Sequence, residues 1–147
     1  MKRSLIGIVA IAGAALVLTA GAVGKSAARS GALHVTKECS EYQGLAGQFC
    51  TITSSNIPAI KPVMRVVYLQ ALGPAGLDSD LVLTSGHGPE AFGHVVLNAT
   101  TSRVTFSGGT GKFAGFQADV IVSVVLVNGA QVWHWDGTYS FTSDEDD

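Results

Sequence analysis

The sequence has little charge and few basic residues, and this scarcity excludes one class of partner. Lys and Arg together number 9 among 147 residues, against 11 Asp and Glu. Two of the basic residues, Lys2 and Arg3, stand at the start of the chain, and the four residues 144–147 are all acidic. A surface that binds nucleic acid needs clustered Lys and Arg to neutralise phosphates. We therefore expect no nucleic-acid partner.

Long apolar runs are also scarce, because only residues 5–18 form one, directly after the two basic residues. Small residues follow, so this order predicts a signal peptide over residues 1–28, with cleavage after Ala22 or after Ala28. An uncleaved membrane anchor is the alternative, since no charge occurs over residues 4–24 and a span needs roughly 20 apolar residues. Once the signal peptide is removed, we expect no membrane span. The protein is then secreted and extracellular, or it belongs to the periplasm or cell envelope.

Cysteine is limited to two residues, Cys39 and Cys50, which both follow the predicted signal peptide. Zinc ligands usually come two to four residues apart, closer than this pair. An even cysteine count in an oxidising compartment predicts a disulfide. Closing so short a loop contributes roughly 3 kcal/mol by the chain-entropy estimate.

Motifs for hydrolysis, metal binding and nucleotide binding are missing. No Gly-x-Ser-x-Gly elbow occurs, and the nearest pair of histidines, His87 and His94, has no clear carboxylate partners. Gly111-Lys112 resembles the end of a phosphate-binding loop, but Phe113 stands where Ser or Thr is required, and a β-rich run follows instead of a helix. We expect no metal and no cofactor.

Helix signals are nearly absent after the signal peptide, and β-branched and aromatic runs take their place. Gly, Pro, Asn and Asp interrupt these runs at short intervals, as is typical of turns between strands. The pattern predicts strands over residues 48–53, 63–72, 77–84, 92–98, 103–107, 118–127 and 131–141.

The last two of these strands meet at Asn128-Gly129, the strongest short-range signal for a β-hairpin. Regular short strands with such turns predict an antiparallel sandwich or barrel. We expect one all-β domain over residues 29–142. Residues 143–147, four of which are acidic, are predicted to be a disordered tail.

A glycine-rich stretch, "GGTGKFAGF", carries a resemblance to a known family. Its characteristic residues are Gly108, Gly109, Thr110, Gly111 and Phe113. The stretch resembles the hairpin of the dirigent proteins and the allene oxide cyclase-like barrels, and "CTITSSN", "LDSDLVL" and "WHWDGTYSF" are similar to bacterial secreted members. The resemblance implies a single antiparallel β-barrel of about eight strands with a largely apolar interior. Plant relatives often assemble as trimers, so it also implies a homotrimer or a homodimer.

The final strand alternates between aromatic and polar residues, which places the two kinds on opposite faces. One face carries Trp133, Trp135 and Tyr139, and we add Tyr68 from an earlier strand as a further candidate pocket residue. A barrel of about eight strands either fills its interior or holds one small ligand. These aromatic residues therefore belong to a packed core or line a cavity for a small apolar ligand.

Two aspartates are the candidate catalytic residues. Asp78 and Asp80 share one face of the strand 77–84, and Leu77, Leu81 and other apolar residues share the opposite face. Two neighbouring carboxylates can share a proton, which suits one of them to acid catalysis. If the leucines face the interior, however, both aspartates are solvated.

Three hypotheses of function follow. The first is a barrel that binds or stereo-guides a small apolar molecule. The second is a cyclase or isomerase of the allene oxide cyclase type, in which a buried carboxylate such as Asp80 assists ring closure. The third is a structural envelope barrel with a filled core. No catalytic residue is carried over from the family, because the carboxylate of the allene oxide cyclases cannot be mapped onto a residue of this sequence. In addition, "GFQADV", around Asp119, lacks the arginine of the dirigent motif.

Overall fold

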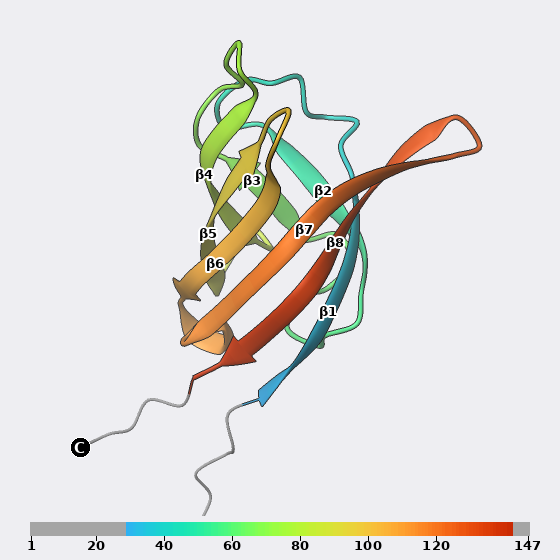
Figure 1. The fold of residues 1–147 in the computed structure, drawn as a ribbon. Coiled ribbons are helices and arrows are strands. Elements are labelled where there is room, and N and C mark those ends of the chain that lie inside the picture. Colours follow the sequence, from blue (N-terminus) through green and yellow to red (C-terminus); the bar gives the residue numbers. More distant parts are fainter. Residues whose placement is uncertain (1–28, 143–147) are drawn as a thin grey trace, which may run out of the picture.

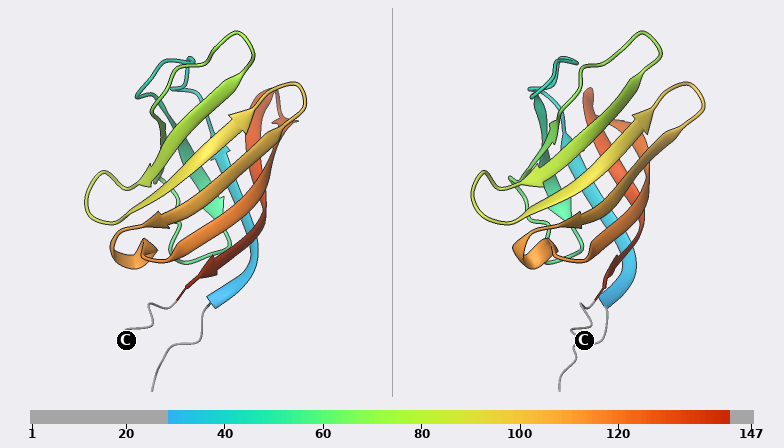
Figure 2. Two further views of the ribbon diagram at one scale, coloured as in Figure 1. Left: turned by 60° about the vertical axis from the view of Figure 1, so that its left-hand side comes forward. Right: turned by 90° about the vertical axis from the view of Figure 1, so that its left-hand side faces the viewer.

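The eight strands of the computed structural model close into one antiparallel barrel in the order β1 to β8 (Figures 1 and 2). The structure describes residues 29–142; the predicted signal peptide and acidic tail lie outside the described residues. The all-β prediction and the eight-stranded barrel are confirmed. The strands are β1 Arg29–Glu38, β2 Phe49–Ser55, β3 Arg65–Tyr68, β4 Leu77–Thr84, β5 Glu90–Leu97, β6 Ser102–Gly109, β7 Phe116–Val127 and β8 Ala130–Phe141.

Two strands differ from the sequence prediction. β1 was not predicted at all, although it joins β8 to β2 and so completes the barrel. Its inward positions carry apolar Leu33 and Val35 but then Lys37, so the apolar alternation is too short to indicate a strand. β3 is shorter than predicted at both ends, and Val63 at the predicted start has a φ of 68°, which a strand does not allow.

The half of the barrel nearest the start of β1 and the end of β8 is filled by aromatic side chains. Phe116 contacts Phe141 with ring centroids 5.0 Å apart, and Phe106 contacts both Phe116 and Trp135. Phe113, in the short 3-10 helix η1 (Gly111–Phe113), adds a fourth phenylalanine and has no exposed surface. This half of the interior is therefore a packed core.

The β7–β8 hairpin extends beyond the barrel wall and projects from it (Figure 1). Its turn has positive φ at Asn128 and Gly129, as the Asn-Gly signal predicts. The pairing of β7 with β6 stops at Ile121, and the pairing of β8 with β1 stops at Trp133. Residues 124–132, which we call the arm, therefore pair only within the β7–β8 hairpin among the described strands. Among residues 29–142 no helix has the length and apolar character to span a membrane.

Candidate functional site

The half of the barrel opposite the aromatic core contains a cavity of about 130 Å³, which we call the end cavity. It lies where β1, β3 and β5 end and where β2, β4 and β8 begin, so loops surround its rim. Buried residues form its floor, among them Lys37, Cys50, Tyr68 and Val122, whereas half-buried Tyr42, Leu97 and Trp133 stand nearer the surface.

Lys37 is the ionisable group at the floor of the end cavity. It occupies the third inward position of β1, after Leu33 and Val35, and only 4% of its surface is exposed. The pairing of β1 with β2 shifts register between Thr36 and Lys37, so that Lys37 lies opposite the buried Ile52. Such β-bulges often re-aim a side chain next to a functional site.

The amine of Lys37 lies among aromatic rings and has one hydrogen-bond partner. Its Nζ donates to the hydroxyl of Tyr68. The same nitrogen lies 4.8 Å from the ring centroid of Trp135 and 5.1 Å from that of Tyr68. No carboxylate among residues 29–142 forms an ion pair with it.

Burial without a counter-ion changes the proton affinity of this amine. Desolvation disfavours the charged form, and it lowers the pKa of Lys37 to about 7. A substantial part of the amine is therefore neutral near neutral pH and carries a free lone pair. Burial also raises the pKa of the neighbouring Tyr68, which keeps its phenol protonated.

Two hydrogen-bond donors around the end cavity lack partners. The hydroxyl of Tyr42 and the indole Nε1 of Trp133 are both buried and make no hydrogen bond within the described chain. Deeper in the core, Nε1 of Trp135 is also unpaired. Buried polar atoms in folded proteins are nearly always paired. Tyr42 and Trp133 both line the end cavity, so these two unpaired donors lie in its wall.

The disulfide lies beside this site. Cys39 and Cys50 are bonded, which confirms the predicted pair, and both residues line the end cavity. Cys39 comes two residues after Lys37, at the point where the chain leaves β1. The bond therefore ties the end of β1 to β2 at the wall that holds the amine.

The four predicted pocket residues are divided between different places. Tyr68 and Trp133 line the end cavity. Trp135 lies beneath the amine of Lys37 with no exposed surface, and it packs on Phe106 as part of the filled core. Tyr139 lies far along β8, where its ring contacts Phe141. The aromatic face of β8 therefore serves both as core and as cavity wall.

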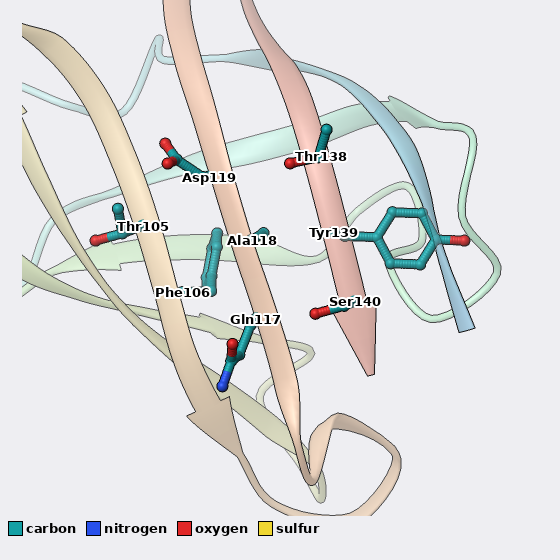
Figure 3. A pocket seen from close by; sticks show the side chains of 8 residues that line it. All are labelled: Thr105, Phe106, Gln117, Ala118, Asp119, Thr138, Tyr139 and Ser140. Atoms are coloured by element: carbon teal, nitrogen blue, oxygen red, sulfur yellow. The ribbon is translucent and has the colours of Figure 1, made fainter. Parts of the chain in front are cut away.

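Tyr139 instead borders a second, more open hollow of about 370 Å³ on the outer wall over β6, β7 and β8. Figure 3 shows Thr105, Asp119 and Thr138 side by side on these three strands, with Gln117 and Ser140 beyond them. Asp119 is already paired, because Arg103 Nε donates to its Oδ1 at 2.7 Å, and this bond lowers the pKa of Asp119. We place the functional site at the end cavity, because the hollow is the more open of the two and none of its lining residues has a buried, unpaired polar atom.

The candidate catalytic aspartates face solvent. Leu77 and Leu81 point into the barrel, and the side chains of Asp78 and Asp80 are 76% and 63% exposed. His94 on β5 lies between them, with Nε2 2.5 Å from Asp78 and Nδ1 2.9 Å from Asp80. The hydrogen bond with Asp80 raises the pKa of His94, and Asp78 adds to the rise. Asp80 is thus not a buried carboxylate, and this geometry gives it no role in ring closure inside the barrel.

The glycine-rich stretch forms the turn from β6 through η1 to β7. Gly108 and Gly111 have positive φ, and Thr110 bonds back to Glu90 at the start of β5. Phe113 follows as a fully buried residue of the core. The stretch therefore closes the packed half of the barrel and lies away from the end cavity.

Sequence reasoning missed Lys37 and Tyr42, the two residues that most distinguish this site. The sequence did contain a signal for Lys37. Alternation along the strand places it on the same inward face as Leu33 and Val35, where an apolar residue is expected. Tyr42 lies in the loop between β1 and β2 and carries no such signal. The sequence also carried no signal for the pairing of Asp119 with Arg103 of β6 across the sheet.

Comparisons of the chain with protein-family models, with curated proteins and with solved structures gave no match. Within residues 29–142, no three His, Cys, Asp or Glu side chains gather in a way that could hold a metal ion.

Proposed function

We propose that this protein is an exported β-barrel that binds one small, largely apolar molecule in the end cavity. The cavity suits a ligand about the size of a single aromatic ring, since an apolar cavity of roughly 150 Å³ takes up benzene. Its walls combine aliphatic Val95, Leu97 and Val122 with the rings of Tyr68 and Trp133. Such a wall with few polar groups is typical of ligand sites.

The observation that carries this proposal is a mostly apolar cavity whose wall holds two unpaired donors, on Tyr42 and Trp133. A barrel built only for packing would gain by pairing or replacing these groups, because each unpaired buried donor costs roughly 1–3 kcal/mol. A ligand with one acceptor oxygen satisfies them and fills the space. Polar edges on an aromatic wall also orient what they bind, which supports stereo-guidance as the use of the site.

Export is supported by the disulfide, because such bonds persist in oxidising compartments. The predicted signal peptide agrees with this assignment. The resemblance to allene oxide cyclase-like barrels adds that an apolar barrel interior in that family shapes a small reactive molecule.

Binding is tested with benzyl alcohol as the probe, which offers one ring and one acceptor oxygen. We expect saturable binding that changes the tryptophan fluorescence, because Trp133 lines the cavity. Val95→Phe fills the cavity and should weaken binding by at least about tenfold, a loss of about 1.4 kcal/mol. Val96→Phe, the neighbouring position on the outer face of β5, is the matched control and should bind as the wild type does.

Circular dichroism establishes that each variant is folded, and Leu97→Trp at the half-buried wall replaces Val95→Phe if that variant does not fold. Native mass spectrometry of the protein from its own medium identifies any molecule that copurifies. A protein that binds no benzyl alcohol and carries no molecule is a structural barrel, and this outcome refutes the proposal.

A further inference from the structure

The amine of Lys37 is the one feature of the end cavity that ligand binding alone does not explain. A lysine in an apolar barrel loses hydration, and no counter-ion among the described residues compensates it. A methionine or leucine at this inward position would pack equally well at no such cost. Lys37 also lies next to the register shift between β1 and β2 and two residues before Cys39 of the disulfide.

We propose that Lys37 forms a reversible imine with a small aldehyde or ketone bound in the end cavity. This inference rests on the proposed binding function and names the chemical class of its ligand. Three observations support it together: a partly enclosed space of ligand size, a lysine at its floor, and unpaired hydrogen-bond donors in its wall. A carbonyl compound offers an electrophilic carbon to the amine and an acceptor oxygen to the unpaired hydrogen-bond donors.

The chemistry needs no further reagent. The lone pair of the neutral amine attacks the carbonyl carbon, and one N–H proton moves to the oxygen, which gives a carbinolamine. The hydroxyl then leaves with the second N–H proton as water, and a C=N bond replaces the C=O bond. Hydrolysis reverses both steps and releases the unchanged carbonyl compound.

Proton affinity and surroundings suit this reaction. Desolvation lowers the pKa of Lys37, so the nucleophilic neutral form is present near neutral pH. Tyr68 accepts the hydrogen bond from Nζ, and its phenol stays protonated because burial raises its pKa. Tyr42 is the other titratable group at the cavity, and burial raises its pKa too. No carboxylate of the described chain pairs with the amine, so no counter-ion holds it in the charged form.

The test uses benzaldehyde and benzyl alcohol, which share a ring and an oxygen but differ in the electrophilic carbon. The purified protein is incubated with benzaldehyde at pH 7 in the presence of sodium cyanoborohydride, which reduces an imine to a stable secondary amine. Intact mass counts the adducts, and peptide mapping places them. The exposed lysines Lys61 and Lys112 are internal controls, because water surrounds their nitrogens.

We expect Lys37 to be modified at least about tenfold faster than either exposed lysine. Lys37→Met should lose this adduct, so that only the slow modification of the exposed lysines remains in the peptide map. Pre-incubation with excess benzyl alcohol should slow trapping at Lys37 and leave Lys61 and Lys112 unaffected. This protection would show that the imine forms inside the cavity.

Other results would refute the imine proposal, and they distinguish its failure from a failure of the proposed binding function. If benzyl alcohol binds but Lys37 is not trapped faster than the exposed lysines, the imine is refuted and the binding function stands. If benzoate binds more tightly than benzaldehyde and protects Lys37 from trapping, the amine serves as an anion site instead. If neither benzaldehyde nor benzyl alcohol binds and no adduct forms, both proposals fail.

Discussion

At the residue scale, Lys37 at the floor of the end cavity stands out among the ionisable groups of the described chain because it is almost fully buried. Most ionisable side chains of the described chain stand in solvent, as Asp78, Asp80 and His94 do on the outer wall. Lys37 is instead buried against Trp135 and Tyr68. Its burial therefore leads to a prediction about the pKa of Lys37, which can be tested without any ligand.

Stability should depend on pH through this one amine. An unfolded lysine keeps its proton up to a pH of about 10.4, whereas folded Lys37 releases it near a pKa of about 7. The unfolded state then binds more protons between these two pH values, so the free energy of unfolding should rise with pH, by at most about 1.4 kcal/mol for each pH unit. Lys37→Met should be more stable than the wild type at pH 6, and this gap should narrow from pH 7 to pH 9.

Urea denaturation at a series of pH values measures this gap, with Lys61→Met as the exposed control. A gap that stays constant over this range would show that the folded protein does not release the proton of Lys37.

At the scale of elements, the glycine-rich turn seals the packed half of the barrel by close approach. A Cβ atom at Gly109 would lie 2.3 Å from the carbonyl oxygen of Glu90 and 2.6 Å from the Cβ of Phe113. These contacts bring η1 against β5 and bury Phe113 in the core. The family-like stretch is thus explained by packing.

Gly109→Ala should therefore destabilise the fold by about 1–3 kcal/mol, because backbone and a buried ring must move to admit one methyl group. Gly73→Ala is the matched control: its Cβ would meet nothing closer than 3.7 Å, so the change should stay within about 0.5 kcal/mol. Thermal and urea unfolding measure both variants. Equal stability of the two variants would mean that β5 and η1 are not held together at Gly109.

At the scale of the whole molecule, the arm formed by residues 124–132 exposes an unusual amount of apolar surface. Val124, Val125, Leu126 and Val127 are 45%, 48%, 69% and 49% exposed, and no Asp, Glu, Lys or Arg occurs from Val120 to Trp135. Contiguous exposed apolar residues on a soluble domain mark a surface that contacts another molecule. The predicted homotrimer or homodimer can be tested here.

Leu126→Lys places a charge near the tip of the arm and should weaken self-association by at least about tenfold, if copies of the chain meet through the arm. Ile121→Lys is the matched control, since Ile121 is 58% exposed but lies where β7 still pairs with β6. Sedimentation equilibrium over a range of concentrations measures both. A wild-type protein that stays monomeric throughout would contradict the predicted assembly.

The sequence by itself determined the fold class, most strand positions, the disulfide and the Asn128-Gly129 turn. These features depend on short-range alternation, turn chemistry and redox compartment, which are local or compositional properties. Only the tertiary structure decided that Trp133 lines a cavity whereas Trp135 belongs to the packed core. The alternation along a strand shows which residues face the interior, but it does not show how far along the barrel axis each one lies. Only barrel closure brought Lys37 and Tyr42 beside Tyr68, because their proximity depends on the registers of β1 with β8 and β2, which residue spacing does not encode.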